Sequence, residues 1–187
     1  MTTLYLASRS PRRKFLLQQL GIDFEVVDVD INEIPGASES ALDYVRRIAL
    51  EKAVACRQSM QKNLPVLAAD TEVVLDNHIL GKPVTRDDAI RMLQSLSGRG
   101  HQVHTAVVLL RDVPVTLVNS SRVWFRSLTL QECQDYCDTC HPLDKAGAYG
   151  IQDKAAGFIQ RFEGSYSGVM GLPLMETAEL LGVRSNG

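Results

Sequence analysis

The fold is decided by the stretch Leu4-Tyr5-Leu6-Ala7-Ser8-Arg9-Ser10-Pro11-Arg12-Arg13. Its first four residues are apolar and predict a strand, and a short polar loop then leads into a helix. Ser10 suits the N-cap of that helix because its hydroxyl can accept a backbone N–H, and Pro11 suits the first helical position. The helix is expected to cover residues 11–20, with Gly21 as a left-handed C-terminal cap.

Positive charge is concentrated where this helix begins. Arg12 and Arg13 lie in the first turn, where the helix dipole makes a cation unfavourable by about 0.3–1 kcal/mol. A bound polyanion would offset that cost and would accept hydrogen bonds from the free backbone N–H groups. We interpret the loop as an anion-binding site, with a solvated basic turn as the alternative.

Composition limits the classes of protein that fit. The chain has 187 residues, of which 45% are hydrophobic and 22% charged, which is typical of one globular domain over residues 1–187. The net charge of −2 argues against a nucleic-acid partner, and no apolar run is long enough to cross a membrane. Because no apolar signal segment begins the chain, we expect a cytoplasmic protein.

Hydrophobic periodicity and turn signals divide the rest of the chain into helices and strands. The predicted helices cover residues 40–59, 85–96, 129–141 and 173–182. The predicted strands cover residues 24–31, 65–69, 73–75, 78–80, 102–110, 115–125 and 158–162. Residues 70–72 are expected to interrupt the central strand, and residues 164–166 to form a turn.

Three cysteines occupy the helix predicted before Pro142. Cys133, Cys137 and Cys140 follow a spacing of i, i+4 and i+7, which places them on one helical face. With His141 they could suggest zinc, but such sites usually bring together two short pairs of ligands from separate turns. We therefore favour buried thiols.

Charged residues follow several of the predicted strands and loops. The positive candidates are Arg12, Arg13, Lys52, Lys82 and Lys145, and the negative candidates are Glu33, Asp70 and Asp144. Lys52 lies on the apolar stripe of its helix, where it could snorkel to solvent or point into a cleft. Asp70 follows an apolar strand, where it could cap a turn or bind a cation. Residues 143–152 mix charge, glycine and one aromatic, which favours a site loop over a connector.

This combination of charges suits one kind of substrate. A nucleoside triphosphate carries about four negative charges, so its phosphates need several cations and a metal. Two carboxylates at strand ends can hold Mg²⁺, and one of them can help to generate a nucleophile from water. No Walker-type or dinucleotide-binding glycine motif is present in the sequence. Direct attack of water on a phosphoanhydride is therefore favoured over covalent catalysis.

Several motifs, in order along nearly the whole chain, resemble the Maf family of nucleoside triphosphate pyrophosphatases. They are Leu6-Ala7-Ser8-Arg9-Ser10-Pro11-Arg12-Arg13, Ala69-Asp70-Thr71, Gly81-Lys82-Pro83, Asp144-Lys145-Ala146-Gly147-Ala148-Tyr149-Gly150-Ile151-Gln152, and Gly164-Ser165-Tyr166 with Val169-Met170-Gly171-Leu172-Pro173. The resemblance implies an α/β fold with an elongated mixed sheet flanked by helices, in two lobes around a central cleft, similar to the inosine-triphosphatase group. It also implies hydrolysis between the α- and β-phosphates, a divalent metal (Mg²⁺ or Mn²⁺) and a homodimer.

The resemblance also assigns roles to residues. Asp70 takes the position of the proton acceptor, and Glu33 joins it around the metal. The positions that match substrate-binding residues are Ser8, Arg12, Arg13, Lys52, Lys82 and Lys145. Arg12, Thr71 and Gln152 match the branch that prefers dTTP and UTP, and the neutral amide of Gln152 can pair with a pyrimidine edge.

Two alternatives to this assignment stay open. One is the branch of the family that acts on 7-methyl-GTP, and the other is a nucleotide-sensing regulator of cell division with little turnover. Glu72 and Gly168 depart from the family pattern. Because side chains alternate along a strand, we expect Glu72 to face away from the site.

Overall fold

A mixed β-sheet with strand order β2-β1-β3-β5-β6-β7 forms the centre of the molecule, and the computed structural model describes residues 3–183. The strands are β1 (Leu4–Ala7), β2 (Phe24–Val27), β3 (Val66–Leu75), β4 (His78–Ile79), β5 (Gly100–Leu110), β6 (Pro114–Phe125) and β7 (Ile159–Glu163). β1 is parallel to β2 and β3, whereas β4 and β5 pair with β3 in the antiparallel sense, as do β6 with β5 and β7 with β6. The predicted α/β class and mixed sheet are confirmed.

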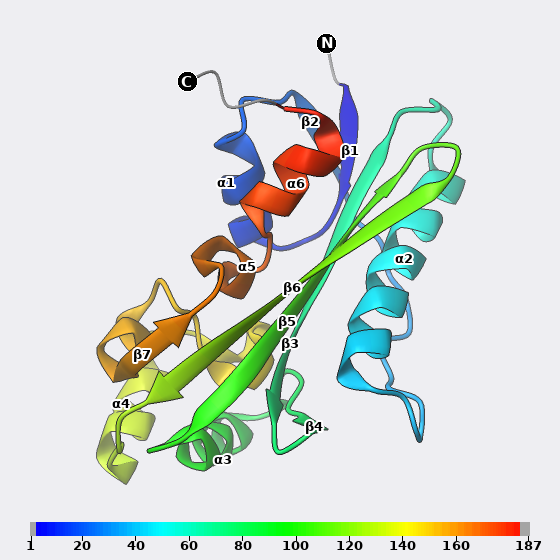
Figure 1. Cartoon of the computed structure of the whole chain (residues 1–187). Helices are drawn as coiled ribbons and strands as arrows, with labels where there is room; N and C mark the ends of the chain where they lie inside the picture. Colours follow the sequence, from blue (N-terminus) through cyan, green and yellow to red (C-terminus); the bar gives the residue numbers. More distant parts are fainter. Residues whose placement is uncertain (1–2, 184–187) are drawn as a thin grey trace.

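Helices gather around both ends of the long strands (Figure 1). They are α1 (Pro11–Gln18), α2 (Ala41–Ser59), α3 (Arg86–Leu96), α4 (Leu130–Thr139), α5 (Tyr166–Met170) and α6 (Leu174–Leu181). Three short 3₁₀ turns complete the chain: η1 (Pro142–Asp144), η2 (Ala146–Ala148) and η3 (Lys154–Phe158). In Figure 1, α2 lies on one side of the sheet, α1 and α6 lie on the other, and α3 and α4 lie at the far end.

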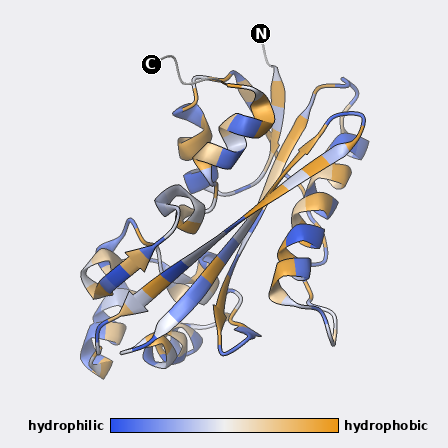
Figure 2. Ribbon diagram, viewed as in Figure 1, coloured by the Kyte–Doolittle hydropathy of each residue, from blue (hydrophilic) through white to orange (hydrophobic). Residues whose placement is uncertain are grey.

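The side chains of β3 alternate between the two faces of the sheet, and they therefore enter different clusters of buried hydrophobic residues. Val66 and Ala68 pack with apolar residues of α2, whereas Leu67 and Ala69 pack with residues of α1 on the opposite face. Farther along, Val73 joins the cluster formed by α3, α4 and the ends of β5 and β6. The apolar colour runs along the long strands where these helices cover them (Figure 2). Helices therefore cover different faces of the sheet in different parts of the molecule. β3 contributes residues to all three hydrophobic clusters.

The local signals at the starts of α1, α3 and α4 are confirmed. Ser10 accepts a hydrogen bond from the Arg13 backbone N–H at 3.4 Å, and Pro11 is the first helical residue. Reciprocal capping boxes join Thr85 with Asp88 and Thr129 with Glu132. These starts could be predicted because both partners of each bond lie within four residues.

Most strand ends differ from the prediction by one or two residues, and β2 and β3 differ more. β2 ends at Val27 rather than at residue 31, because its partner β1 has only four residues and the pairing stops at Ala7 opposite Val27. β3 continues without a break through residues 70–72, because β5 pairs with residues 66–74 in unbroken register. Asp70 therefore lies inside a strand and not after its end.

Helix ends also differ slightly from the prediction. α1 ends at Gln18, although Gly21 has the expected left-handed backbone with φ of 66°. The turn expected at residues 164–166 leads directly into α5, with Ser165 as its N-cap. Pro173 is the N-cap of α6 rather than its first residue, and Gly182 ends that helix with φ of 69°.

The cysteine-bearing helix packs as its spacing predicts. Cys133 and Cys137 are buried in the cluster formed by α3 and α4, while Cys140 is partly exposed. All four cysteines are free thiols. Over residues 3–183, none of the helices combines the length and apolar character needed to span a membrane.

A buried histidine lies beneath the predicted site loop. His101 on β5 is 4% exposed, and its Nε2 lies 2.7 Å from the hydroxyl of Tyr149. Its Nδ1 is also buried and has no hydrogen-bond partner in the described chain. Burial lowers the pKa of His101 from 6.5 to about 4, because the charged ring would lose its hydration.

We expect His101 to make the fold sensitive to acid. Between pH 6.5 and 4 the unfolded state binds more protons than the folded state, so stability rises with pH in this window and is lost as the pH falls. The slope contributed by one histidine is at most about 1.4 kcal/mol per pH unit. Urea unfolding across this range should show a shallower slope for His101→Gln, which can still hydrogen-bond to Tyr149. Equal slopes for the two proteins would contradict this assignment.

Candidate active site

A cleft opens where β1 ends beside β3. β1 pairs with β3 only as far as Ala7 opposite Ala68, and β4 begins to pair with β3 at Val74. Between these points one edge of β3 lacks a neighbouring strand, and Asp70 and Thr71 lie on this stretch. A cavity of about 310 Å³ lies beside it, large enough for a small ligand.

Nine of the ten predicted site residues line this cavity. They are Ser8, Arg12, Arg13, Glu33, Lys52, Asp70, Thr71, Lys82 and Gln152. They come from loops and strands far apart in the sequence, which the sheet brings together. Lys145 is the one predicted residue that is not part of the lining.

The loop between β1 and α1 forms one wall. Ser8 is buried, and its hydroxyl accepts a hydrogen bond from the Ser10 backbone N–H at 3.1 Å. Arg12 extends from α1 to Asp144, with Nη1 2.8 Å from Oδ2 of the carboxylate. Hydrogen bonds to Lys145 and Arg12 lower the pKa of Asp144 although burial opposes this. The anionic Asp144 thus holds Arg12 at the cleft wall.

Arg13 is held in place by hydrogen bonds to two other segments of the protein. Its Nε donates to the carbonyl of Gly171 at 2.7 Å, and its Nη2 donates to Thr71 Oγ1 at 3.1 Å. Thr105 Oγ1 lies 3.0 Å from the same Thr71 hydroxyl and also donates to the carbonyl of Gly168. Burial lowers the pKa of Arg13, against the attraction of Asp70. Arg13 therefore fixes Thr71 and the Gly171 segment in addition to lining the cleft.

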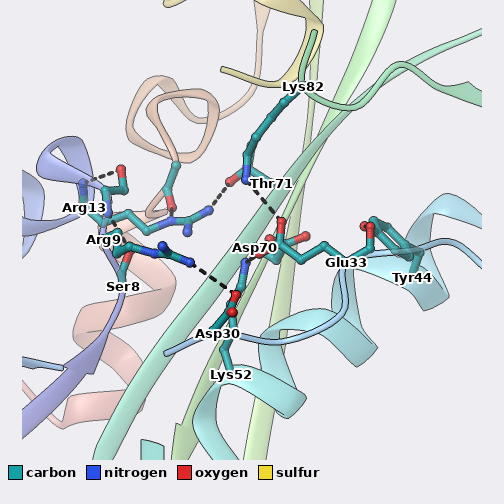
Figure 3. A network of polar contacts seen from close by, with 12 residues as sticks. Ser8, Arg9, Arg13, Asp30, Glu33, Tyr44, Lys52, Asp70, Thr71 and Lys82 are labelled. Atoms are coloured by element: carbon teal, nitrogen blue, oxygen red, sulfur yellow. Dashed lines mark hydrogen bonds and ion pairs between the residues drawn. The ribbon is translucent and has the colours of Figure 1, made fainter. Parts of the chain in front are cut away.

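Lys52 joins the two predicted acids on the opposite face of β3 (Figure 3). Its Nζ lies 2.8 Å from Asp70 Oδ1 and 2.7 Å from Glu33 Oε1, and its side chain is 9% exposed. Lys82 reaches the other oxygen of Glu33, with Nζ 3.1 Å from Oε2. The snorkelling alternative for Lys52 is thus wrong, because its ammonium is buried between two carboxylates.

These ion pairs set the charge of Glu33. Burial opposes its ionisation, but hydrogen bonding and attraction from Lys52, followed by Lys82, lower its pKa from 4.5 to about 2. The hydroxyl of Tyr44 donates to the backbone carbonyl of Glu33 at 3.0 Å and holds the loop over α2. Glu33 is therefore anionic near neutral pH and fixed at the cleft.

Glu72 does not face away from the site, contrary to the prediction. Residues two apart on a strand share a face, so Glu72 projects from β3 on the same side as Asp70. It is 7% exposed, and burial, followed by repulsion from Asp70, raises its pKa from 4.5 to about 8. The prediction failed because Asp70, which belongs to the site, lies two residues before Glu72 on an unbroken strand.

Lys145 contacts the loop that carries Asp144 and is not part of the cavity wall. Its buried Nζ lies 3.0 Å from the carbonyl of Cys140, 2.7 Å from that of His141 and 2.9 Å from Asp144 Oδ1. These contacts join the end of α4 to the loop that carries Asp144. Lys145 therefore positions Asp144, and through it Arg12.

Sequence reasoning gave no specific role to three further side chains that line the cavity. Arg9 lines the cavity, with its Nε 2.9 Å from Asp28. Tyr149 lines it from the site loop, and Asp144 was a candidate that was given no role. The three closely spaced arginines were the signal that could have identified Arg9.

The side chains of the protein do not by themselves complete the coordination of a metal ion. Over residues 3–183, no three His, Cys, Asp or Glu side chains form a group that could hold a metal ion. Glu33 and Asp70 each give one oxygen to Lys52, while Asp70 Oδ2 is buried without a hydrogen-bond partner. The unpartnered oxygen of Asp70, next to the carboxylate of Glu33, suits a cation that takes its other ligands from water and phosphate.

The mixed sheet with its helices defines an α/β protein. Its cleft is lined by both basic and acidic side chains, and the basic ones suit it to anionic ligands. The Staphylococcus aureus Ham1 structure aligns with 64% of this chain and 69% of its own, with a TM-score of 0.46 and 16% identity.

A family model described as "Maf-like protein" matches residues 3–183. The dTTP/UTP pyrophosphatase of Alkalilimnicola ehrlichii is 50% identical over 183 residues, covering 95% of this chain and 91% of the relative. The protein of the same name from Methylobacillus flagellatus is also 50% identical, covering 97% and 92%. The chain belongs to the Maf family.

We expect Gly147 to be essential for the position of the site loop. Its φ is 66°, its N–H donates to the carbonyl of Gly81 at 2.8 Å, and an added Cβ would come within 2.9 Å of Val73. Gly147→Ala should lower the free energy of unfolding by about 1–3 kcal/mol in urea titrations, through backbone strain and overpacking. The matched control is Gly157→Ala, where an added Cβ meets no atom within 4 Å. Equal stability of the two variants would contradict this role.

Proposed function

We propose that this protein hydrolyses dTTP and UTP to the nucleoside monophosphate and pyrophosphate. The observation that carries the proposal is the buried Lys52, which holds Glu33 and Asp70 within 2.8 Å in a cleft whose other wall is the start of α1. Relatives that are half identical over nearly the whole chain carry the name dTTP/UTP pyrophosphatase. The single domain predicted over residues 1–187 is part of this proposal.

A divalent metal, Mg²⁺ or Mn²⁺, belongs to the proposal. Asp70 and Glu33 would hold it, because both are carboxylates at the cleft and Asp70 Oδ2 lacks a partner. When bound, such an ion neutralises phosphate charge and lowers the pKa of a bound water. With only two carboxylates available, water and substrate phosphates would supply the remaining ligands.

Asp70 is the proposed proton acceptor. Lys52 donates a hydrogen bond to its Oδ1, which fixes the carboxylate at the cleft, where it would accept a proton from water. A new P–O bond joins the water oxygen to one of the two phosphorus atoms. The bond between that phosphorus and the oxygen that bridges the α- and β-phosphates breaks, and the bridging oxygen leaves with the other phosphate group. The reaction thus needs no covalent intermediate with the protein.

The start of α1 is the proposed phosphate-binding end of the site. Its free backbone N–H groups and the hydroxyl of Ser8 lie beside Arg12 and Arg13. Lys82 extends from the opposite side, and its Nζ contacts only Glu33 within the described chain. A triphosphate between these cations would offset the unfavourable charge in the first turn of α1.

Gln152 and Thr71 are the proposed specificity residues, together with Arg12. Gln152 is exposed at the cleft, where its amide can both donate to and accept from a pyrimidine base. A carboxylate in its place would favour the donor edge of guanine. A cytoplasmic homodimer stays a prediction, as does the absence of nucleic-acid and membrane partners.

Asp70→Asn should lower kcat for dTTP by about 10²–10⁴-fold, because the amide cannot accept the proton. The variant should remain folded, since its amide oxygen can still accept a hydrogen bond from Lys52. Circular dichroism and steady-state kinetics together check this result. The matched control is Asp112→Asn in the exposed turn after β5, which should keep full activity. Turnover of Asp70→Asn at the wild-type rate would remove Asp70 from the mechanism.

Purified protein with Mg²⁺ should convert dTTP and UTP to monophosphate and pyrophosphate, as followed by ³¹P NMR. In direct competition it should prefer dTTP to 7-methyl-GTP, and Gln152→Glu should reduce this preference by about 10-fold or more. Preference for 7-methyl-GTP would place the chain in the other branch of the family. Tight binding of dTTP without products would favour the sensor, and release of orthophosphate would contradict the proposed reaction.

A further inference from the structure

Two buried carboxylates lie next to each other on one face of β3. Asp70 and Glu72 are separated by one residue, so both project toward the side covered by α2. Their exposed fractions are only 4% and 7%. Because a strand rises about 3.3–3.4 Å per residue, their Cα atoms are about 7 Å apart, close enough for both side chains to reach one ion.

Glu72 lacks the partners that its neighbours have. Its Oε2 is buried without a hydrogen bond, and over residues 3–183 no hydrogen bond or ion pair reaches its side chain. Lys52 binds Glu33 and Asp70, and Lys82 binds Glu33. A carboxylate buried in this way is costly unless something compensates it.

The residue opposite Glu72 does not supply that compensation. His104 on β5 is its register partner, and the Nδ1 of His104 lies 2.8 Å from Ser120 Oγ. Asp70 Oδ2, on the same face as Glu72, is also buried and unpartnered. Asp70 and Glu72 therefore each have one buried oxygen on this face that no group of residues 3–183 contacts by a hydrogen bond.

We propose that Glu72 is a ligand of the divalent cation, and that the ion binds between Asp70 and Glu72 with water and phosphate as its other ligands. Oxygen ligands at 2.0–2.6 Å are what Mg²⁺, Mn²⁺ and similar hard cations require, and two carboxylates from alternate positions of one strand can supply them. The identity of the ion rests on the proposed function. The inference gives the cation a ligand beside Asp70 whose oxygen has no partner, whereas both oxygens of Glu33 pair with lysines.

Binding of Mn²⁺ alone, without nucleotide, tests this ligand. Isothermal titration or electron paramagnetic resonance of the full chain should show that Glu72→Gln binds Mn²⁺ at least 10-fold more weakly than the wild type. The control is Glu179→Gln on the exposed side of α6, which removes the same charge and should keep wild-type affinity. Unchanged affinity in Glu72→Gln, or no Mn²⁺ binding by the wild type, overturns the proposal.

Thermal unfolding separates a ligand from a structural residue. Without metal, Glu72→Gln should melt at the same temperature as the wild type or higher, because the Glu72 side chain has no hydrogen bond or ion pair to lose. Mn²⁺ should raise the melting temperature of the wild type and have a much smaller effect on the variant. A variant that melts earlier without metal and keeps the full rise with Mn²⁺ would show that Glu72 only supports the fold.

The two proposals can fail separately. Hydrolysis of dTTP by the wild type, with Mn²⁺ affinity unaffected by Glu72→Gln, would leave the proposed function standing and remove Glu72 as a ligand. Loss of Mn²⁺ affinity in the variant, with no hydrolysis by the wild type, would remove the function and leave the metal site.

Discussion

The buried ammonium of Lys52 is the interaction on which the site depends. It lies on α2 and contacts acids from two other segments, Glu33 on the loop after β2 and Asp70 on β3. Lys52 offsets the burial of Asp70, because burial of an unpaired charge is costly, and it shares Glu33 with Lys82. The apolar packing of α2 against β3 therefore also determines where the acids lie.

The position of the cleft follows from the length of β1. This strand has only four residues, so β3 continues past it with an open edge that carries Asp70 and Thr71. Side-chain alternation then separates their tasks: Asp70 faces Lys52, whereas Thr71 faces Arg13. The two walls of the site are thus two faces of one strand, joined across the cleft by the loop before α1.

Local signals in the sequence predicted much of the fold, and pairs distant in sequence were harder to predict. Ser10 and Pro11 mark the start of α1 because their effects are confined to one turn. The course of β3 through Asp70 could not be predicted, because the lysine that compensates this acid is 18 residues away on another element. Lys145 was recognised as important, but its contacts with backbone carbonyls are visible only in the folded loop.

The central claim is that Lys52 acts by fixing Asp70, and a double-mutant cycle on kcat for dTTP tests it most directly. Lys52→Met should cause a large loss of kcat in the wild type and a much smaller loss in Asp70→Asn, because the residue that it positions is already disabled. Equal losses in the two backgrounds would contradict the account, since Lys52 and Asp70 would then act independently.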